Sequence, residues 1–299
     1  DIREPRGRFA PRKLVFQGVV LEPSFLDVRR TRDPVAVAGD MHLAPLLAEP
    51  CILFDPRGWL KPLAAAVAPE VRRRCHAQRR LAQALVAATP SEPYASVPEG
   101  PGLGAGCWRH AAHAFGVMRC AGTVLVAGQV YPTTRRSFVV ARVLLRSVGH
   151  EPVADELLRL LGSLALSRGE VEALAAESER SYDLAVAVRR TPVVMDWNVS
   201  SDARALERAA VREMMAAGHH REAVYQLLLV RTVVLGILEN DAGADILTSS
   251  RDGYNRLLTA LGIGDDESLR ARGREVRAFL PVLTGVCEAV LARAPALCD

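Results

Sequence analysis

The chain has 299 residues, and 49% of them are hydrophobic, so it can hold one large domain or two ordinary ones around a sizeable core. Its net charge is +4, and 36 of the 38 basic residues are arginine, because Lys13 and Lys61 are the only lysines. The 34 acidic residues are interspersed with them, which disfavours a basic face for nucleic acid. No run of about 18 uncharged apolar residues exists, which argues against a membrane span.

The cysteines and the start of the chain bear on its compartment. The six cysteines form no CxxC pair and no spacing typical of a metal site, and a disulfide framework is unusual in a chain this long. We therefore expect reduced thiols and a cytoplasmic protein. The chain starts at Asp1 without the apolar core of a secretory signal, so we expect a fragment or a processed product.

Two strands are predicted near the start, over residues 13–16 and 19–26, because both segments are rich in valine, leucine and phenylalanine. Gln17-Gly18 between them favours a two-residue hairpin turn, since glycine readily adopts a positive φ. Pro23 removes one donor from the second strand, which places that strand at the edge of a sheet or at a bulge.

The next segment is predicted to be a short helix followed by a strand. Residues 33–48 are helical by composition, with interruptions at Gly39 and Pro45. Cys51–Phe54 is a short apolar run that predicts a buried strand. Asp55-Pro56-Arg57-Gly58 then indicates a turn.

After residue 60 the apolar residues recur at helical spacing, so the rest of the chain is predicted to be successive helices. Residues 89–107 are rich in proline and glycine and are interpreted as a linker. Gly218 between two helical stripes predicts a C-cap and a tight helical turn. The predicted fold class is therefore α+β, with the remnant of a mixed sheet in residues 1–60, a connecting helix and linker in 61–107, and a helical bundle domain in 108–299.

Glu22 is the first candidate functional residue. On a strand it shares a face with Val20, Ser24 and Leu26. A carboxylate among apolar neighbours costs free energy unless it is paired or binds a metal. The alternative is that this face is exposed to solvent or that Glu22 meets an arginine.

Four segments together resemble the nucleotidyltransferase superfamily, in its kanamycin-nucleotidyltransferase-like branch with a C-terminal helical domain. They are Val19-Val-Leu-Glu22-Pro-Ser-Phe-Leu26, Ile52-Leu-Phe-Asp55-Pro-Arg-Gly58, Pro132-Thr-Thr-Arg-Arg136 before a helix, and Gly218-His-His-Arg-Glu-Ala223 at a helical turn. The resemblance covers most of the chain in the order of its elements. It implies that residues 1–60 are the C-terminal part of a catalytic domain.

The resemblance also implies a reaction. In that family, two carboxylates of an Asp-x-Asp strand and a third on a neighbouring strand hold two magnesium ions, and a Gly-Ser loop grips the phosphates. Glu22 matches the third carboxylate, as a metal ligand or as the base that takes a hydroxyl proton, whereas the Gly-Ser and Asp-x-Asp motifs are absent from this chain. The implied activity is transfer of a nucleoside monophosphate from a nucleoside triphosphate to a hydroxyl of a small-molecule acceptor, with Mg²⁺, and a homodimer is compatible with it.

Other functions stay open at this stage. The chain is alternatively a non-catalytic regulatory module whose helical bundle holds a ligand or a partner protein. A third hypothesis is a ribonuclease that uses Arg212 and His219. Further candidates have simpler interpretations: Asp55 as a turn residue, and Asp40 and His42 as a solvated face.

The remaining candidate sites have weaker patterns. His110 and His113 lie three residues apart beside Cys107, but no fourth zinc ligand is near them in the sequence. The glycine-rich segment 100–106 does not follow a strand, so it lacks the context of a phosphate loop. The arginines of 72–74 and 79–80 lie on one helix, as a solvated face or as the border of a cleft that binds phosphate.

We predict that this chain does not bind magnesium–nucleotide tightly. Glu22 is one carboxylate where a two-metal mechanism needs several. Calorimetric titration with Mg²⁺ and a non-hydrolysable nucleoside triphosphate measures this directly. Micromolar affinity that requires Mg²⁺ would contradict the prediction of an incomplete metal site.

Overall fold

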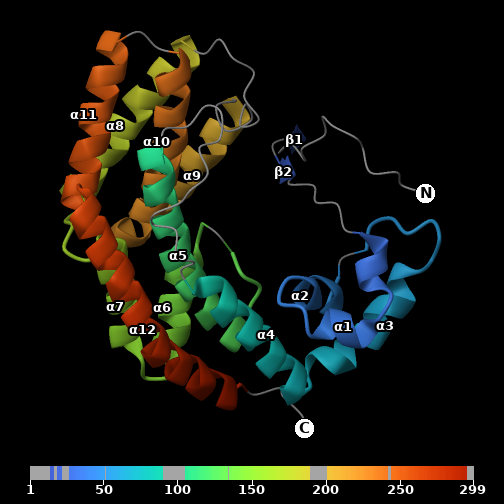
Figure 1. Cartoon of the computed structure of the whole chain (residues 1–299). Helices are drawn as coiled ribbons and strands as arrows, with labels where there is room; N and C mark the ends of the chain where they lie inside the picture. Colours follow the sequence, from blue (N-terminus) through green and yellow to red (C-terminus); the bar gives the residue numbers. More distant parts are fainter. Residues whose placement is uncertain are drawn as a thin grey trace.

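The computed structural model describes residues 14–16, 19–21, 27–50, 52–89, 105–133, 135–188, 201–241 and 244–294. These residues form α-helices α1 to α12, one 3₁₀ helix and one pair of short strands (Figure 1). The helical bounds are η1 Val28–Thr31, α1 Pro34–Ala38, α2 Leu43–Ala48, α3 Leu60–Val71, α4 Arg74–Ala88, α5 Ala105–Ala127, α6 Ser137–Ser147, α7 Glu151–Leu161, α8 Arg168–Val188, α9 Ser201–Ala216, α10 His220–Asp241, α11 Ala244–Ala260 and α12 Asp266–Ala292.

The predicted α+β fold class is wrong, because the described chain is all-α apart from one small hairpin. β1 (Leu14–Phe16) pairs antiparallel with β2 (Val19–Leu21), and no third strand joins them among the described residues. The predicted strand at Cys51–Phe54 is absent over its described part, where Leu53 and Phe54 are 92% and 81% exposed. A short apolar run does not by itself specify a strand, since a strand also needs a neighbour to pair with.

Helix α5 lies at the centre of the bundle and packs against α4, α6, α7, α10 and α12. Its inward positions alternate small and branched residues, such as Ala114, Val117, Ala121 and Val124, all fully buried. Small side chains let neighbouring helices approach closely, while valine fills the remaining space. This sequence pattern explains how one helix can contact five others.

The helical spacing predicted after residue 60 is confirmed by buried faces on α6 and α8. Phe138, Ala141 and Leu145 of α6 are buried, as are Val171 and Tyr182 of α8. The predicted turn between α9 and α10 is also confirmed. Gly218 there has a φ of 83°, a left-handed conformation that favours glycine at a helix C-terminus.

Helix α4 connects the bundle to a second, smaller group of helices. Its apolar residues Ala77 and Leu81 belong to the bundle core. Helices α1, α2 and α3 instead pack on each other and lie beside α4 in Figure 1. Their separate core consists of Val37, Leu43, Leu47, Leu63 and Val67. We call α1–α3 the N-terminal helical group.

Two helix ends show how local sequence fixes the bundle. Asp265 accepts hydrogen bonds from the backbone N–H groups of Glu267 and Ser268, which caps the start of α12 in a capping box. Gly162 ends α7 with a φ of 93°, and a Cβ built there would lie 2.2 Å from the carbonyl oxygen of Leu261. Glycine is therefore required at 162 by its conformation and also by the close approach of the chain after α11.

We predict that Gly162→Ala destabilises the protein more than Gly149→Ala. Both glycines have a positive φ, but a Cβ at Gly149 meets nothing within 4 Å. Gly149→Ala should cost about 1–2 kcal/mol for the left-handed conformation alone. Gly162→Ala adds the clash with the Leu261 carbonyl to this cost. Chemical denaturation of both variants measures the difference in their free energies of unfolding. Equal losses would show that the backbone at Leu261 moves away freely.

Candidate functional site

The sequence-predicted catalytic residue, Glu22, lies outside the described residues. Asp55 lies at the turn where it was expected, and its Oδ2 accepts the backbone N–H of Leu60 at 2.9 Å. The N–H of Gly58 donates to the backbone carbonyl of Asp55 at 3.1 Å. The turn role of Asp55 is therefore confirmed.

Asp40 serves as a cap for the helix that follows it. Its Oδ1 accepts the backbone N–H groups of His42 and Leu43, both at 2.9 Å, and its Oδ2 binds Arg30 at 2.9 Å. Partial burial acts to raise the pKa of Asp40, but the hydrogen bonds from Leu43 and His42 and the charge of Arg30 outweigh it and lower the pKa. These contacts give Asp40 a structural role.

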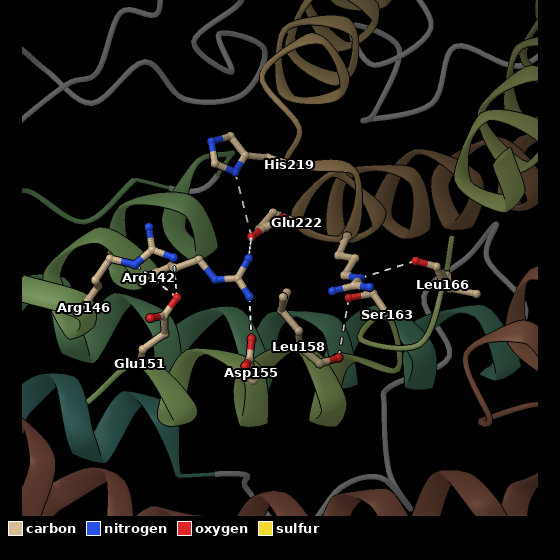
Figure 2. Close-up of polar contacts among 10 residues, drawn as sticks. Arg142, Arg146, Glu151, Asp155, Leu158, Ser163, Leu166, His219 and Glu222 are labelled. Atoms are coloured by element: carbon tan, nitrogen blue, oxygen red, sulfur yellow. Dashed lines mark hydrogen bonds and ion pairs between the residues drawn. The ribbon is translucent and has the colours of Figure 1, made fainter. Parts of the chain in front are cut away.

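Arg212 and His219, the residues of the ribonuclease hypothesis, have different neighbours. Arg212 lines a cavity between α8, α9 and α10. The Nδ1 of His219 lies 4.0 Å from the carboxylate of Glu222 (Figure 2). In that figure the guanidinium of Arg142 lies between two carboxylates, 2.7 Å from Glu222 and 2.5 Å from Asp155. The side chain of Glu222 is 2% exposed. The arginine thereby ties α6 to α7 and α10, which is a structural role.

The histidine pair of α5 is part of the packing between helices. His113 is fully buried, and desolvation lowers its pKa to about 3, so the ring is neutral at physiological pH. The ring of His110 meets Tyr254 edge-on, with 5.7 Å between ring centroids. Within the described ranges, no group of three or more histidine, cysteine or acidic side chains has the arrangement of a metal site.

A cavity of about 400 Å³ lies where the N-terminal helical group meets the bundle. Residues of α2, α3 and α4 line it, together with the end of α5 and the residues just after it. We call it the seam cavity. Much of its wall is apolar, from residues such as Met41, Pro45, Val126 and Val130. Its polar lining comes from Arg72, Arg80, Glu49, Gln129 and Tyr131.

Arg80 joins three segments at the seam cavity and is only 3% exposed. Its Nη1 donates to the carbonyl of Ala38 at the end of α1. Its Nη2 donates to the carbonyl of Val71 at the end of α3, at 3.0 Å, and to the side-chain oxygen of Gln129. A planar guanidinium with five N–H donors can reach all three at once.

The charge of Arg80 has no acidic partner within 4.0 Å among the described side chains. Desolvation lowers its pKa to about 10, which still leaves it charged at neutral pH. Arg231 is equally buried, but its environment includes the carboxylate of Glu177. Arg142 has two carboxylates. Arg80 thus differs from these arginines, because its partners among the described residues are all carbonyl oxygens.

The backbone around Arg80 supports this arrangement. Gln129 has a φ of 59°, a left-handed conformation uncommon for a residue other than glycine. This turn at the end of α5 directs the side chain of Gln129 to Arg80. Gln83, one turn beyond Arg80, donates to the carbonyl of Gly39 and accepts the N–H of Met41. Side-chain hydrogen bonds of Arg80 and Gln83 therefore cross the seam beside the apolar wall of the cavity.

The mouth of the seam cavity carries one pair of opposite charges. Arg72 and Glu49 approach to 4.0 Å, and their side chains are 65% and 86% exposed. Such an exposed pair contributes little to stability. At this mouth Arg72 would attract an anionic ligand, and Glu49 would repel it.

The sequence pointed to one part of this site and missed the rest. The sequence places the arginines of 72–74 and 79–80 on one helix, as a solvated face or the border of a phosphate-binding cleft, and Arg72 and Arg80 do line the seam cavity. The prediction of one helix is wrong, because α3 ends at Val71 and α4 begins at Arg74. Nothing in the sequence singled out Gln129, because its role depends on a left-handed turn at a non-glycine residue. Comparisons with protein-family models, curated proteins and solved structures return no match. None of the described helices combines the length and apolarity of a membrane span.

We predict that Arg80→Lys lowers the free energy of unfolding by about 1–3 kcal/mol, because an ammonium cannot reach all three oxygens and leaves buried acceptors unsatisfied. Arg79→Lys is the matched control, since Arg79 is exposed on the same helix and should change stability by less than about 0.5 kcal/mol. Denaturant titration measures both. Equal effects would contradict a joining role for Arg80.

Proposed function

We propose that this chain is a non-catalytic helical module that binds a small anionic molecule in the seam cavity. The ligand carries a phosphate or carboxylate group that approaches Arg80 and Arg72, and its body contacts the apolar wall. The observation that carries the proposal is the buried guanidinium of Arg80, which lines a cavity and lacks an acidic partner among the described residues.

The electrostatics favour an anion at this place. A buried charge without a counter-ion costs several kcal/mol, and buried charges in proteins are usually paired. The carbonyls of Ala38 and Val71 offset part of this cost, because they lie at helix C-termini that carry partial negative charge. An anionic ligand would supply the remaining compensation, and the low local dielectric would strengthen its attraction to Arg80.

Size and lining also suit a small molecule. A cavity of about 400 Å³ lies in the range of small-molecule sites, which are mainly apolar with a few convergent polar groups. It lies between two parts of the chain that have separate cores, a common place for ligand sites. A cytoplasmic location remains part of the proposal.

Nucleotidyl transfer stays a prediction that depends on Glu22 and on motifs absent from this sequence. Its proposed cofactors, Mg²⁺ and a nucleoside triphosphate, would bind at Glu22 and not in the seam cavity. The phosphate groups of a nucleotide are one source of the anion that the seam cavity would hold. Binding in the seam cavity differs from the two-metal site because it needs no magnesium.

Isothermal titration calorimetry with pyrophosphate, in the presence of a chelator, tests the proposal. We expect saturable binding with a Kd of about 1 mM or tighter. Glu49→Gln should tighten it by about 2–5-fold, and Arg72→Gln should weaken it by a similar factor, because each removes one exposed charge at the mouth. A loss of structure would weaken binding in both variants. Tighter binding by Glu49→Gln together with weaker binding by Arg72→Gln would therefore show an effect of charge.

Arg73→Gln is the control for non-specific attraction. Arg73 is exposed, carries the same charge and is adjacent to Arg72, but it is not part of the cavity lining. The Arg73→Gln variant should bind pyrophosphate with the same affinity as the wild type. The same titration with acetate and with a nucleoside triphosphate distinguishes a carboxylate from a phosphate ligand. If none of the three binds, or if Arg73→Gln and Arg72→Gln weaken binding equally, the proposal is wrong.

A further inference from the structure

A second cavity, of about 280 Å³, lies at the other end of the bundle between α8, α9 and α10. We call it the α9 cavity. Its apolar walls come from all three helices: Ala175, Ala176, Val211, Leu227 and Val230. Interiors of proteins are packed with few voids larger than a water molecule, so a half-open space of this size is a distinct feature of the bundle.

Arginines at regular spacing line one side of the α9 cavity. Arg204, Arg208 and Arg212 follow each other at intervals of four residues on α9, so they lie on one face of the helix. Arg204 and Arg208 share the carboxylate of Glu179, and Arg204 also pairs with Asp183 at 2.5 Å. These two guanidinium groups are therefore neutralised by acidic residues of α8.

Arg212 continues the same face but lacks this compensation. It is exposed and lies within 4.0 Å of no carboxylate among the described side chains. Glu207, the other acidic residue of the lining, is already bound by Arg135 at 2.9 Å and by the side chain of Gln226. Among the described side chains, Arg212 is thus the positive charge at the rim of the α9 cavity that no carboxylate compensates.

The wall of the α9 cavity also contains a hydroxyl without a partner. Ser178 of α8 is 5% exposed, and its Oγ is buried and makes no hydrogen bond. A buried polar group left without a partner is uncommon in proteins. Rotation about χ1 moves a serine hydroxyl between staggered positions, so a polar atom of a bound molecule could satisfy it.

From these observations we propose that the α9 cavity binds a small molecule with an apolar body and a single carboxylate. The carboxylate pairs with the guanidinium of Arg212, whose planar fork can bind a carboxylate through two parallel hydrogen bonds. The apolar body displaces water from the alanine, valine and leucine walls. This site is independent of the seam cavity, since no residue lines both.

Octanoate is a suitable probe, with 1-octanol as its neutral counterpart. Calorimetry of the full chain should show saturable octanoate binding at concentrations below the critical micelle concentration, and 1-octanol should bind about 2–5-fold more weakly. Arg212→Gln should remove this preference, so that its affinities for the two probes become similar. Arg57→Gln is the matched control, because Arg57 is also exposed but is not part of this cavity.

A second variant tests the place of binding without changing charge. Ala176 is exposed at the edge of the α9 cavity, so Ala176→Trp should fill the mouth at little cost in stability, and octanoate binding should be lost while the thermal unfolding transition remains. If the tryptophan variant does not fold, the loss of the octanoate preference in Arg212→Gln tests the proposal by itself. Absence of saturable octanoate binding, or equal changes in Arg212→Gln and Arg57→Gln, would overturn the proposal.

Discussion

The guanidinium of Arg80 binds three carbonyl-type oxygens that come from distant parts of the chain. Ala38 belongs to α1, Val71 to the end of α3, and Gln129 to the turn after α5. Helix α4 carries the buried Arg80 beside its apolar residues Ala77 and Leu81, so the same helix belongs to the bundle core and to the seam. The position of the N-terminal helical group, and with it the seam cavity, depends on these hydrogen bonds.

The N-terminal helical group and the bundle have separate cores, and hydrogen bonds of Arg80 and Gln83 link the two parts. Apolar cores are held by non-directional burial, whereas the seam is held by a few directional hydrogen bonds to Arg80 and Gln83. A directional contact tolerates little displacement before it is lost. A ligand that neutralises Arg80 would strengthen the seam, because it would stabilise a charge that burial has made costly.

The arginines of this protein have different roles that composition does not reveal. Arg142 lies between two carboxylates and joins three helices. Arg204 pairs with acidic residues and also lies over the ring of Tyr182, at 5.0 Å from its centroid. Arg212 forms no ion pair with a carboxylate among the described residues. Residue type and charge are identical in all three, so their roles follow from the acids and rings placed beside them.

Local features of the fold were predictable from the sequence, because they depend on residues close together in the chain. The helical character after residue 60 follows from apolar spacing, and the turn at Gly218 follows from the conformational freedom of glycine. The interruption of the 33–48 helix at Gly39 is observed as the end of α1. The turn at Asp55 likewise needed only its own backbone neighbours.

Tertiary structure alone decided the fold class and the candidate sites. The apolar segment with Leu53 and Phe54 is exposed because no described strand pairs with it, and the sequence of the segment does not contain that information. Five arginines lie between 72 and 80, yet only Arg80 is buried. Its position is surrounded by oxygens of residues that lie 42, 9 and 49 positions away along the chain. Burial and charge compensation depend on which segments meet in space, and for this chain only the packed structure specifies those meetings.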